Sequence, residues 1–158
     1  MKILVCVSVV PDTTTKITFT DGNTQFNKTG VQFIINPYDE LALTRALDIT
    51  EPIGGTVTVI TVGEADTEPV IRKALAMGAT DAIRVDANPS DGMYVAAQIA
   101  EQAKSGEYDM ILTGRESIDY NGGQVQGLIA EILNWPLINV AMELDVTDKK
   151  VTAVRDID

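Results

Sequence analysis

The chain has 158 residues, of which 45% are hydrophobic and 22% charged, a composition typical of one globular domain rather than of a disordered segment. Its net charge of −11 disfavours binding to nucleic acid or to an anionic membrane. The absence of histidine and the single cysteine, Cys6, disfavour zinc hydrolysis, Ser-His-Asp catalysis and internal disulfides. No apolar stretch is long enough to span a bilayer, so we expect a soluble, cytoplasmic protein without direct membrane insertion.

Short and almost continuously apolar segments recur along the chain, as is typical of parallel strands buried on both faces. The predicted strands are 2–8, 56–62, 82–85, 110–113 and 137–141. Segments with helical periodicity separate them. The sequence therefore predicts an α/β fold in which an open, mostly parallel sheet carries helices on both faces.

Four helices are predicted between these strands, over 37–50, 65–77, 91–104 and about 123–135. Asn36 is the expected N-cap of the first helix, because its side chain can accept hydrogen bonds from the first-turn amides. Ser90 is the expected N-cap of the third. Gly78 favours the left-handed conformation that follows the second helix, and Pro136 prevents the fourth from continuing.

Two segments interrupt this alternation of strands and helices. Residues 16–20 and 25–27 flank Asp21-Gly22, a pattern that predicts a polar hairpin or arm inserted after the first strand. Residues 142–146 and 151–154 flank a polar turn, which predicts a second hairpin at the C-terminal end.

The segment 114–125, between a predicted strand and a predicted helix, holds most candidate binding residues. Ligands of open α/β sheets bind at the carboxyl ends of strands, and the free N–H groups of a first helical turn suit a phosphate. Gly122 and Gly123 allow close backbone approach, while Arg115 and Ser117 can add a charge and a hydroxyl donor. Two interpretations remain open, a phosphate site and a structural turn with an N-cap.

Two other element ends offer weaker candidates. Residues 36–39 open the first predicted helix, where plain N-capping is the alternative, and Val62-Gly63 ends a strand, where a tight turn is the alternative. Glu116 and Asp119 form a carboxylate pair of the kind that does acid and base work. Without histidine no nucleophile with an adjacent base can be assembled, so we expect no catalytic centre.

Five segments, taken in order, resemble the beta (small) subunits of electron-transfer flavoproteins. They are 3–7 followed by Pro11-Asp12, then 36–40, 74–79 (Ala-Leu-Ala-Met-Gly-Ala), 114–119 (Gly-Arg-Glu-Ser-Ile-Asp) and Trp135-Pro136. The resemblance implies a sheet like that of the adenine nucleotide alpha hydrolases, with an adenine nucleotide bound at its edge. In most members this nucleotide is AMP, and in bifurcating members it is a second FAD.

The same resemblance implies partners and site residues. The family pairs with an alpha subunit that holds FAD, and the complex carries electrons from acyl-CoA or other dehydrogenases. Carried over by position, the adenosine contacts fall on Cys6, Asn36, Pro37, Tyr38, Asp39 and Val62. The phosphate contacts fall on Gly114, Arg115, Glu116, Ser117, Ile118, Asp119, Tyr120, Asn121, Gly122, Gly123, Gln124 and Val125.

Length sets this chain apart from the family. Family members continue past a segment like 154–158 with a further C-terminal section, including an arm that recognises dehydrogenases. We therefore expect residues 1–158 to form a single adenine-nucleotide-binding domain of a shortened beta subunit, an electron carrier rather than an enzyme. The alternative is a freestanding ATP-binding domain of the universal-stress or ATP-pyrophosphatase type, although the pyrophosphatase Ser-Gly-Gly-x-Asp loop does not follow the first strand.

Overall fold

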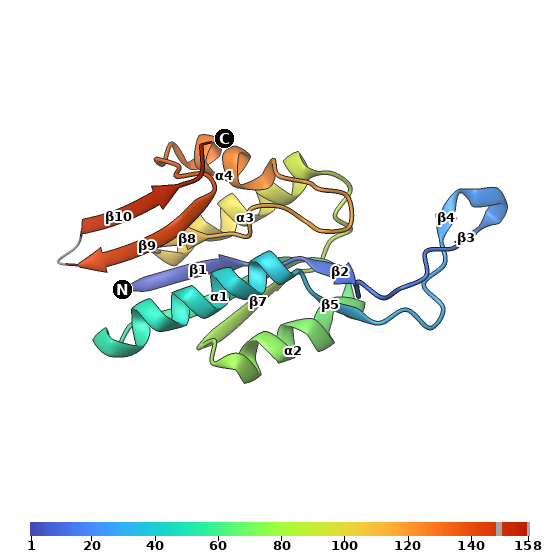
Figure 1. Ribbon diagram of the computed structural model, residues 1–158, viewed down its shortest axis with the longest axis horizontal. Helices are drawn as coiled ribbons and strands as arrows, with labels where there is room; N and C mark the ends of the chain where they lie inside the picture. Colours follow the sequence, from blue (N-terminus) through green and yellow to red (C-terminus); the bar gives the residue numbers. More distant parts are fainter. Residues whose placement is uncertain (148–149, 158) are drawn as a thin grey trace.

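A four-stranded parallel sheet forms the centre of the computed structural model, which describes residues 1–147 and 150–157 (Figure 1). Its strands are β1 (Lys2–Cys6), β6 (Thr56–Val62), β7 (Asp81–Val85) and β8 (Met110–Leu112). They lie in the order β7-β6-β1-β8, with Ile3 in register with Val57 on one side and with Met110 on the other. The predicted α/β class is confirmed.

Two helices cover each face of the sheet. Helices α1 (Pro37–Thr50) and α2 (Glu68–Met77) pack on one face, and α3 (Gly92–Gly106) and α4 (Val125–Leu133) pack on the other. Alternate residues of β1 supply the two cores, because successive side chains of a strand point to opposite faces. Ile3 and Val5 join the first core, whereas Leu4 and Cys6 join the second.

The chain reverses its direction of progress across the sheet at β1. From β1 it passes through α1 to β6 and through α2 to β7, and α3 then returns it to β8 on the opposite side of β1. The carboxyl ends of β1 and β8 are therefore neighbours whose following segments diverge. Such a switch point leaves a crevice in open α/β sheets.

The helix ends agree with the sequence in part. Helix α1 has the predicted bounds, and α2 begins after a 3-10 turn, η3 (Ala65–Thr67). Ser90 as the cap of α3 is wrong, because the extended residue Asp91 takes that position and its Oδ1 accepts from the Tyr94 N–H at 2.8 Å. Helix α4 is shorter than predicted and ends where Asn134 turns left-handed at φ 53°.

The predicted strand 137–141 is wrong except for its last residue. Ala141 begins β9 (Ala141–Thr147), while the residues before it form no strand. Val140 has a positive φ of 52°, a conformation that interrupts an extended strand and is rare for a β-branched residue. Leu137 and Ile138 are half-exposed, so this apolar run marks a surface rather than a buried strand.

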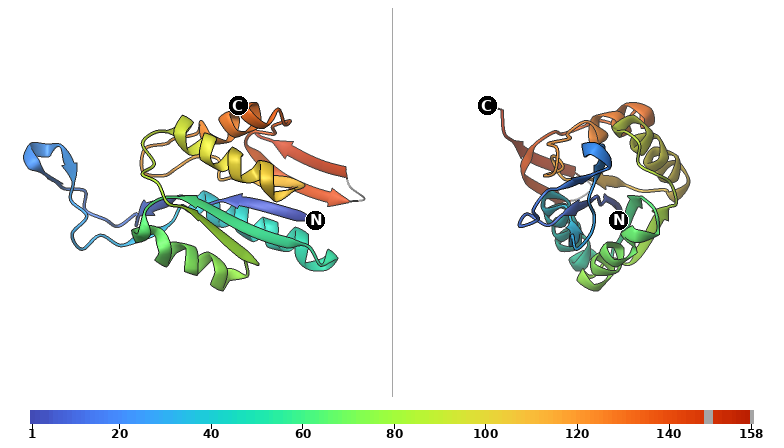
Figure 2. Two further views of the ribbon diagram at one scale, coloured as in Figure 1. Left: turned by 180° about the vertical axis from the view of Figure 1, so that it is seen from behind. Right: turned by 90° about the vertical axis from the view of Figure 1, so that its right-hand side faces the viewer.

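Both predicted hairpins are present. After β1, β2 (Val9–Pro11) pairs antiparallel with β5 (Phe33–Ile35), and between them β3 (Phe19–Thr20), η1 (Asp21–Asn23) and β4 (Gln25–Phe26) form an arm. Figures 1 and 2 show this arm projecting from the end of the body toward which β1 runs. At the other end of the sequence, β9 pairs with β10 (Lys150–Arg155), and part of the predicted turn, residues 148 and 149, lies outside the described residues.

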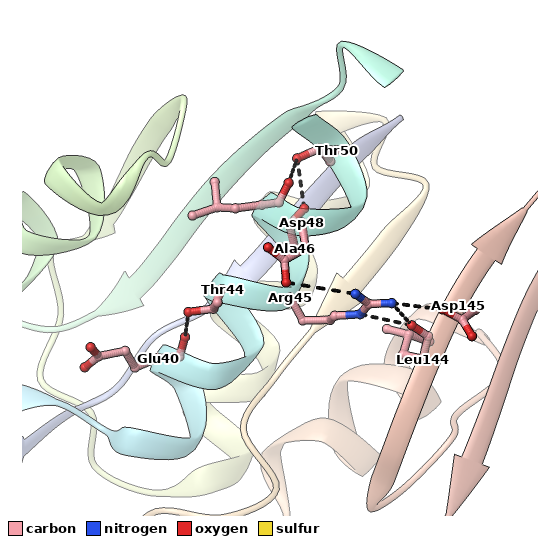
Figure 3. Close-up of polar contacts among 9 residues, drawn as sticks. Glu40, Thr44, Arg45, Ala46, Asp48, Thr50, Leu144 and Asp145 are labelled. Carbon is pink, nitrogen blue, oxygen red and sulfur yellow. Dashed lines mark hydrogen bonds and ion pairs between the residues drawn. The ribbon is translucent and has the colours of Figure 1, made fainter. Parts of the chain in front are cut away.

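The C-terminal hairpin is attached to α1 rather than to the central sheet. Arg45 of α1 donates from Nε to the Leu144 carbonyl at 3.0 Å, and its Nη2 lies 3.1 Å from Asp145 Oδ1 (Figure 3). The hairpin forms its own two-stranded sheet.

A short turn, η2 (Glu51–Ile53), follows α1. In the described part of the chain no helix has the length and apolar character needed to cross a membrane.

Candidate functional site

A cavity of about 740 Å³ opens at the carboxyl edge of the sheet. The end of β1, the segment after β6, the loop 88–92 after β7 and the loop after β8 all contribute to its lining. Its volume lies within the range of about 300–1,000 Å³ common for small-molecule and cofactor sites. The cavity thus lies at the carboxyl ends of the strands, where the topology places a switch point between β1 and β8.

Asp39, in the first turn of α1, joins three elements beneath this cavity. The Ser8 N–H and hydroxyl donate to its Oδ2 at 2.8 and 2.5 Å, and the Gly114 N–H donates to its Oδ1 at 2.9 Å. The side chain thus holds the segments after β1 and β8 against the start of α1. Gly114 has no room for a side chain, because an added Cβ would collide with Asp39 Oδ1 and lie 2.8 Å from the Tyr38 Cβ.

Burial controls the ionisation of two residues at this edge. It raises the pKa of Asp39, and the hydrogen bonds from Ser8 and Gly114 act in the opposite direction. Burial also raises the pKa of the Cys6 thiol, and the Asp39 carboxylate adds to this increase. A protonated thiol is a poor nucleophile, and Asp39 is engaged by three donors. Both residues therefore suit a structural or binding role better than a catalytic one.

Asn36 does not act as the predicted side-chain cap of α1. Its Nδ2 donates to the Glu116 carbonyl at 2.9 Å, and its Oδ1 accepts from the Ile118 N–H at 3.3 Å. The side chain is buried, with 1% exposure, so these partners satisfy groups that would otherwise be costly to bury. Asn36 fixes the loop after β8 to the start of α1, which is a long-range contact that capping rules do not consider.

The amino end of α4 supplies the electropositive part of the cavity. No side chain caps this helix at Gln124, and first-turn N–H groups have no partner within a helix. Val125 and Gln126 line the cavity. The preceding loop is folded on itself, since the Ser117 N–H donates to the Gly122 carbonyl at 2.9 Å and the Ser117 hydroxyl donates to Asp119. Free amides and the helix dipole together favour an anion here.

The sequence-predicted site residues divide into two groups in the structure. Those that line the cavity are Cys6, Asn36, Asp39, Val62, Gly114, Glu116, Ser117, Asp119, Tyr120, Gly122 and Val125. Those that lie outside its lining are Pro37, Tyr38, Arg115, Ile118, Asn121, Gly123 and Gln124. The guanidinium of Arg115 lies 5.7 Å from the centre of the Tyr38 ring, and its Nε is 3.8 Å from Glu116 Oε1.

Other lining residues were not among the sequence candidates. Lys28, which follows the arm, and Phe33 at the start of β5 also line the cavity, and the loop 88–92 reaches it from β7. Lys28 is the sole lysine or arginine among the described lining residues, against six carboxylates, and its Nζ is 3.3 Å from Asp66 Oδ2. The strand-end rule points to the loop after β7, whereas no local signal in the arm points to Lys28.

Comparisons with known proteins identify the family of the chain. The chain matches the electron transfer flavoprotein domain family over residues 23–158. Electron transfer flavoprotein subunit beta of Bacillus subtilis (strain 168) is 35% identical over 162 residues, covering 100% of this chain and 62% of its own length. The corresponding subunit of Syntrophomonas wolfei is 35% identical over 160 residues, covering 100% of this chain and 63% of its own.

A third relative belongs to a named enzyme complex. Caffeyl-CoA reductase-Etf complex subunit CarD of Acetobacterium woodii is 33% identical over 163 residues, covering 100% of this chain and 62% of its own length. This chain thus spans less than two thirds of the length of these relatives. It belongs to the electron transfer flavoprotein family and is similar along its whole length to the beta subunits of that family.

Proposed function

We propose that this chain is the nucleotide-binding part of an electron transfer flavoprotein beta subunit. It holds an adenine nucleotide, AMP or FAD, in the cavity at the carboxyl edge of the sheet. It pairs with an alpha subunit that bears FAD, and the complex carries electrons from acyl-CoA or other dehydrogenases. The observation that carries the proposal is the uncapped amino end of α4 facing a crevice at the switch point of the sheet.

The lining suits the two ends of such a nucleotide. Cys6, Val62 and Ile99 offer apolar surface on one side, where an adenine ring can exclude water. The first turn of α4 offers N–H groups on another side, where phosphate oxygens can accept hydrogen bonds. Carboxylates such as Glu116 and Asp119 can accept from ribose hydroxyls.

The role of the chain's own residues is to bind and orient. Asp39 and Asn36 fix the loop after β8, so the phosphate-binding groups are already in place before the ligand arrives. When FAD is bound, its flavin supplies the electron-transfer chemistry. No residue of this chain needs to form a covalent bond or transfer a proton in this proposal.

The test is release and identification of any nucleotide that purifies with the chain, followed by calorimetry of the emptied protein with AMP, ADP and FAD. We expect AMP or FAD to bind with 1:1 stoichiometry. Gly122→Val, which adds bulk at the cavity lining, should weaken binding, whereas Gly127→Ala in α4 should not, since an added Cβ at Gly127 meets nothing within 4 Å. A correctly folded chain that neither retains nor binds any of the three nucleotides would refute the proposal.

A further inference from the structure

The loop before α4 contains the one Asn-Gly pair of the sequence, Asn121-Gly122. Asn121 is exposed, and neither residue belongs to a helix or a strand. In the part of the chain that the structure describes, the Gly122 N–H donates to no acceptor, whereas the Gly122 carbonyl accepts from the Ser117 N–H at 2.9 Å. The side-chain amide of Asn121 and the backbone nitrogen that follows it are therefore both free to react.

Asn134, at the carboxyl end of α4, provides a comparison within the same chain. Its backbone is left-handed like that of Asn121, with φ 53° against 56°. The residue after Asn134 is Trp135, whose N–H donates to the Ala130 carbonyl at 2.9 Å. A reaction at the Trp135 nitrogen has to break this hydrogen bond and accommodate a bulky side chain. Gly122 presents neither obstacle, because it has no side chain.

The backbone nitrogen after an asparagine can attack the carbon of the side-chain amide, and asparagine is a thermolabile residue for this reason. A new N–C bond closes a five-membered succinimide ring, the bond from that carbon to the amide nitrogen breaks, and the N–H proton leaves with this nitrogen as ammonia. Water then opens the ring at either carbonyl, which gives aspartate or isoaspartate. We infer that Asn121 is a site of this self-modification, whose one co-reactant is water.

The location of Asn121 links the modification to the cavity at the carboxyl edge. Its neighbours Tyr120 and Gly122 line the cavity, and α4 begins shortly after them at Val125. Either product adds a carboxylate that repels an anion and competes with it for the positive end of the helix dipole. Isoaspartate also lengthens the main chain by one atom inside the loop that the Ser117–Gly122 hydrogen bond closes. This effect on the cavity rests on the proposed function, whereas the modification itself does not.

The first test is incubation of the folded chain in mildly alkaline buffer, with peptide mapping by mass spectrometry over time. We expect Asn121 to convert at least about 10-fold faster than Asn134. Aspartate and isoaspartate should both form, because water can open the ring at either carbonyl, and the ammonia released should equal the asparagine lost. Circular dichroism at each time point checks that the chain stays folded.

The second test is calorimetry with AMP. The converted chain, separated by anion-exchange chromatography, should bind AMP about 2- to 5-fold more weakly than the fresh chain. Asn121→Gly removes the reactive amide and keeps a residue suited to a left-handed backbone, so its affinity should not decline during the same incubation. Asn134→Gly is the matched control. It retains Asn121, and its affinity should decline as that of the unchanged chain does.

Several results would overturn the inference. Absence of conversion at Asn121, equal conversion of Asn121 and Asn134 in the folded chain, or conversion to aspartate without isoaspartate would remove Asn121 as a succinimide site. Conversion that leaves the affinity for AMP unchanged would break the link to the cavity. A fresh, folded chain that binds no AMP, ADP or FAD would instead refute the proposed function, and the mass measurement at Asn121 would still decide the modification.

Discussion

Two hollows in the described part of the molecule, the cavity at the carboxyl edge and the apolar groove beside β8, are built in opposite ways. At the carboxyl edge, buried polar side chains cross between elements, and Asp39 and Asn36 hold backbone groups of β1, α1 and the loop after β8. Beside β8, a groove of about 520 Å³ has a mostly apolar lining that includes Leu137 and Ile138. A preorganised polar hollow suits a small ligand with groups to hydrogen-bond, whereas an apolar hollow suits another apolar surface.

The largest effect is expected from removing the carboxylate that organises the polar hollow. Asp39→Ala leaves the Ser8 and Gly114 donors without their acceptor in a buried place, which costs about 3 kcal/mol of unfolding free energy. Urea unfolding measures this loss. Asp48→Ala, on the same helix but with a side chain 58% exposed, should change the free energy of unfolding by less than about 1 kcal/mol. If the two variants lowered the free energy of unfolding equally, Asp39 would not be the residue that organises this part of the fold.

A smaller loss of stability is expected at Gly114. Gly114→Ala forces the new methyl group against Asp39 and Tyr38, and overpacking of this kind costs about 1–3 kcal/mol. Gly127→Ala has free space around its Cβ and should stabilise helix α4 by up to about 1 kcal/mol. Thermal unfolding should show a lower melting temperature for Gly114→Ala and a slightly higher one for Gly127→Ala than for the unchanged chain. A tolerated Gly114→Ala would show that the hollow is less rigid than its contacts indicate.

The raised pKa of Asp39 gives the polar hollow a pH dependence. Because the folded-state pKa lies above the ordinary value of 3.8, the folded chain holds this proton more tightly than the unfolded chain. The stability that this adds is present in full below the unfolded pKa and is lost as pH rises through the folded pKa. The free energy of unfolding of the unchanged chain, minus that of Asp39→Asn, should therefore fall with rising pH. A difference that stays flat or rises with pH would contradict the burial effect.

The smallest effect is expected at the arm. Lys28→Gln removes the one basic side chain among the described lining residues and should weaken AMP binding by about 0.5–1 kcal/mol, more at low salt. Lys16→Gln, on the same arm but outside the lining, should leave the affinity unchanged. Calorimetry at two salt concentrations measures both. If the two variants behave alike, the arm does not contribute to the polar hollow.

Local patterns in the sequence were sufficient for most of the fold. Apolar runs located the four strands of the sheet, and Asn36-Pro37 located the start of α1. The error at 137–141 arose because a short apolar run predicts a buried strand. Here the run lines a groove at the surface instead of lying in the sheet. Serine and aspartate are both favoured at the N-cap position of a helix. Asp91 rather than Ser90 caps α3, because Asp91 has the extended backbone and accepts the first-turn hydrogen bond.

The site was predictable to the extent that it follows from strand ends. The strand-end rule located Val62 and Gly114 at the cavity, and the family resemblance added Cys6. The role of Asn36 was not predictable, because its partners are 80 and 82 residues away in the sequence. Lys28 was missed for a similar reason, since only the path of the arm brings it to the cavity.

The position of Cys6 allows its reactivity to report on the state of the cavity. The chain has one cysteine, it lines the cavity at the carboxyl edge, and burial keeps its thiol protonated. Its reaction with a small alkylating reagent therefore requires the surrounding segments to open, and a molecule seated in the cavity blocks the approach. The labelling rate at a single native site then follows both occupancy and opening of the cavity, without a dye or an introduced residue.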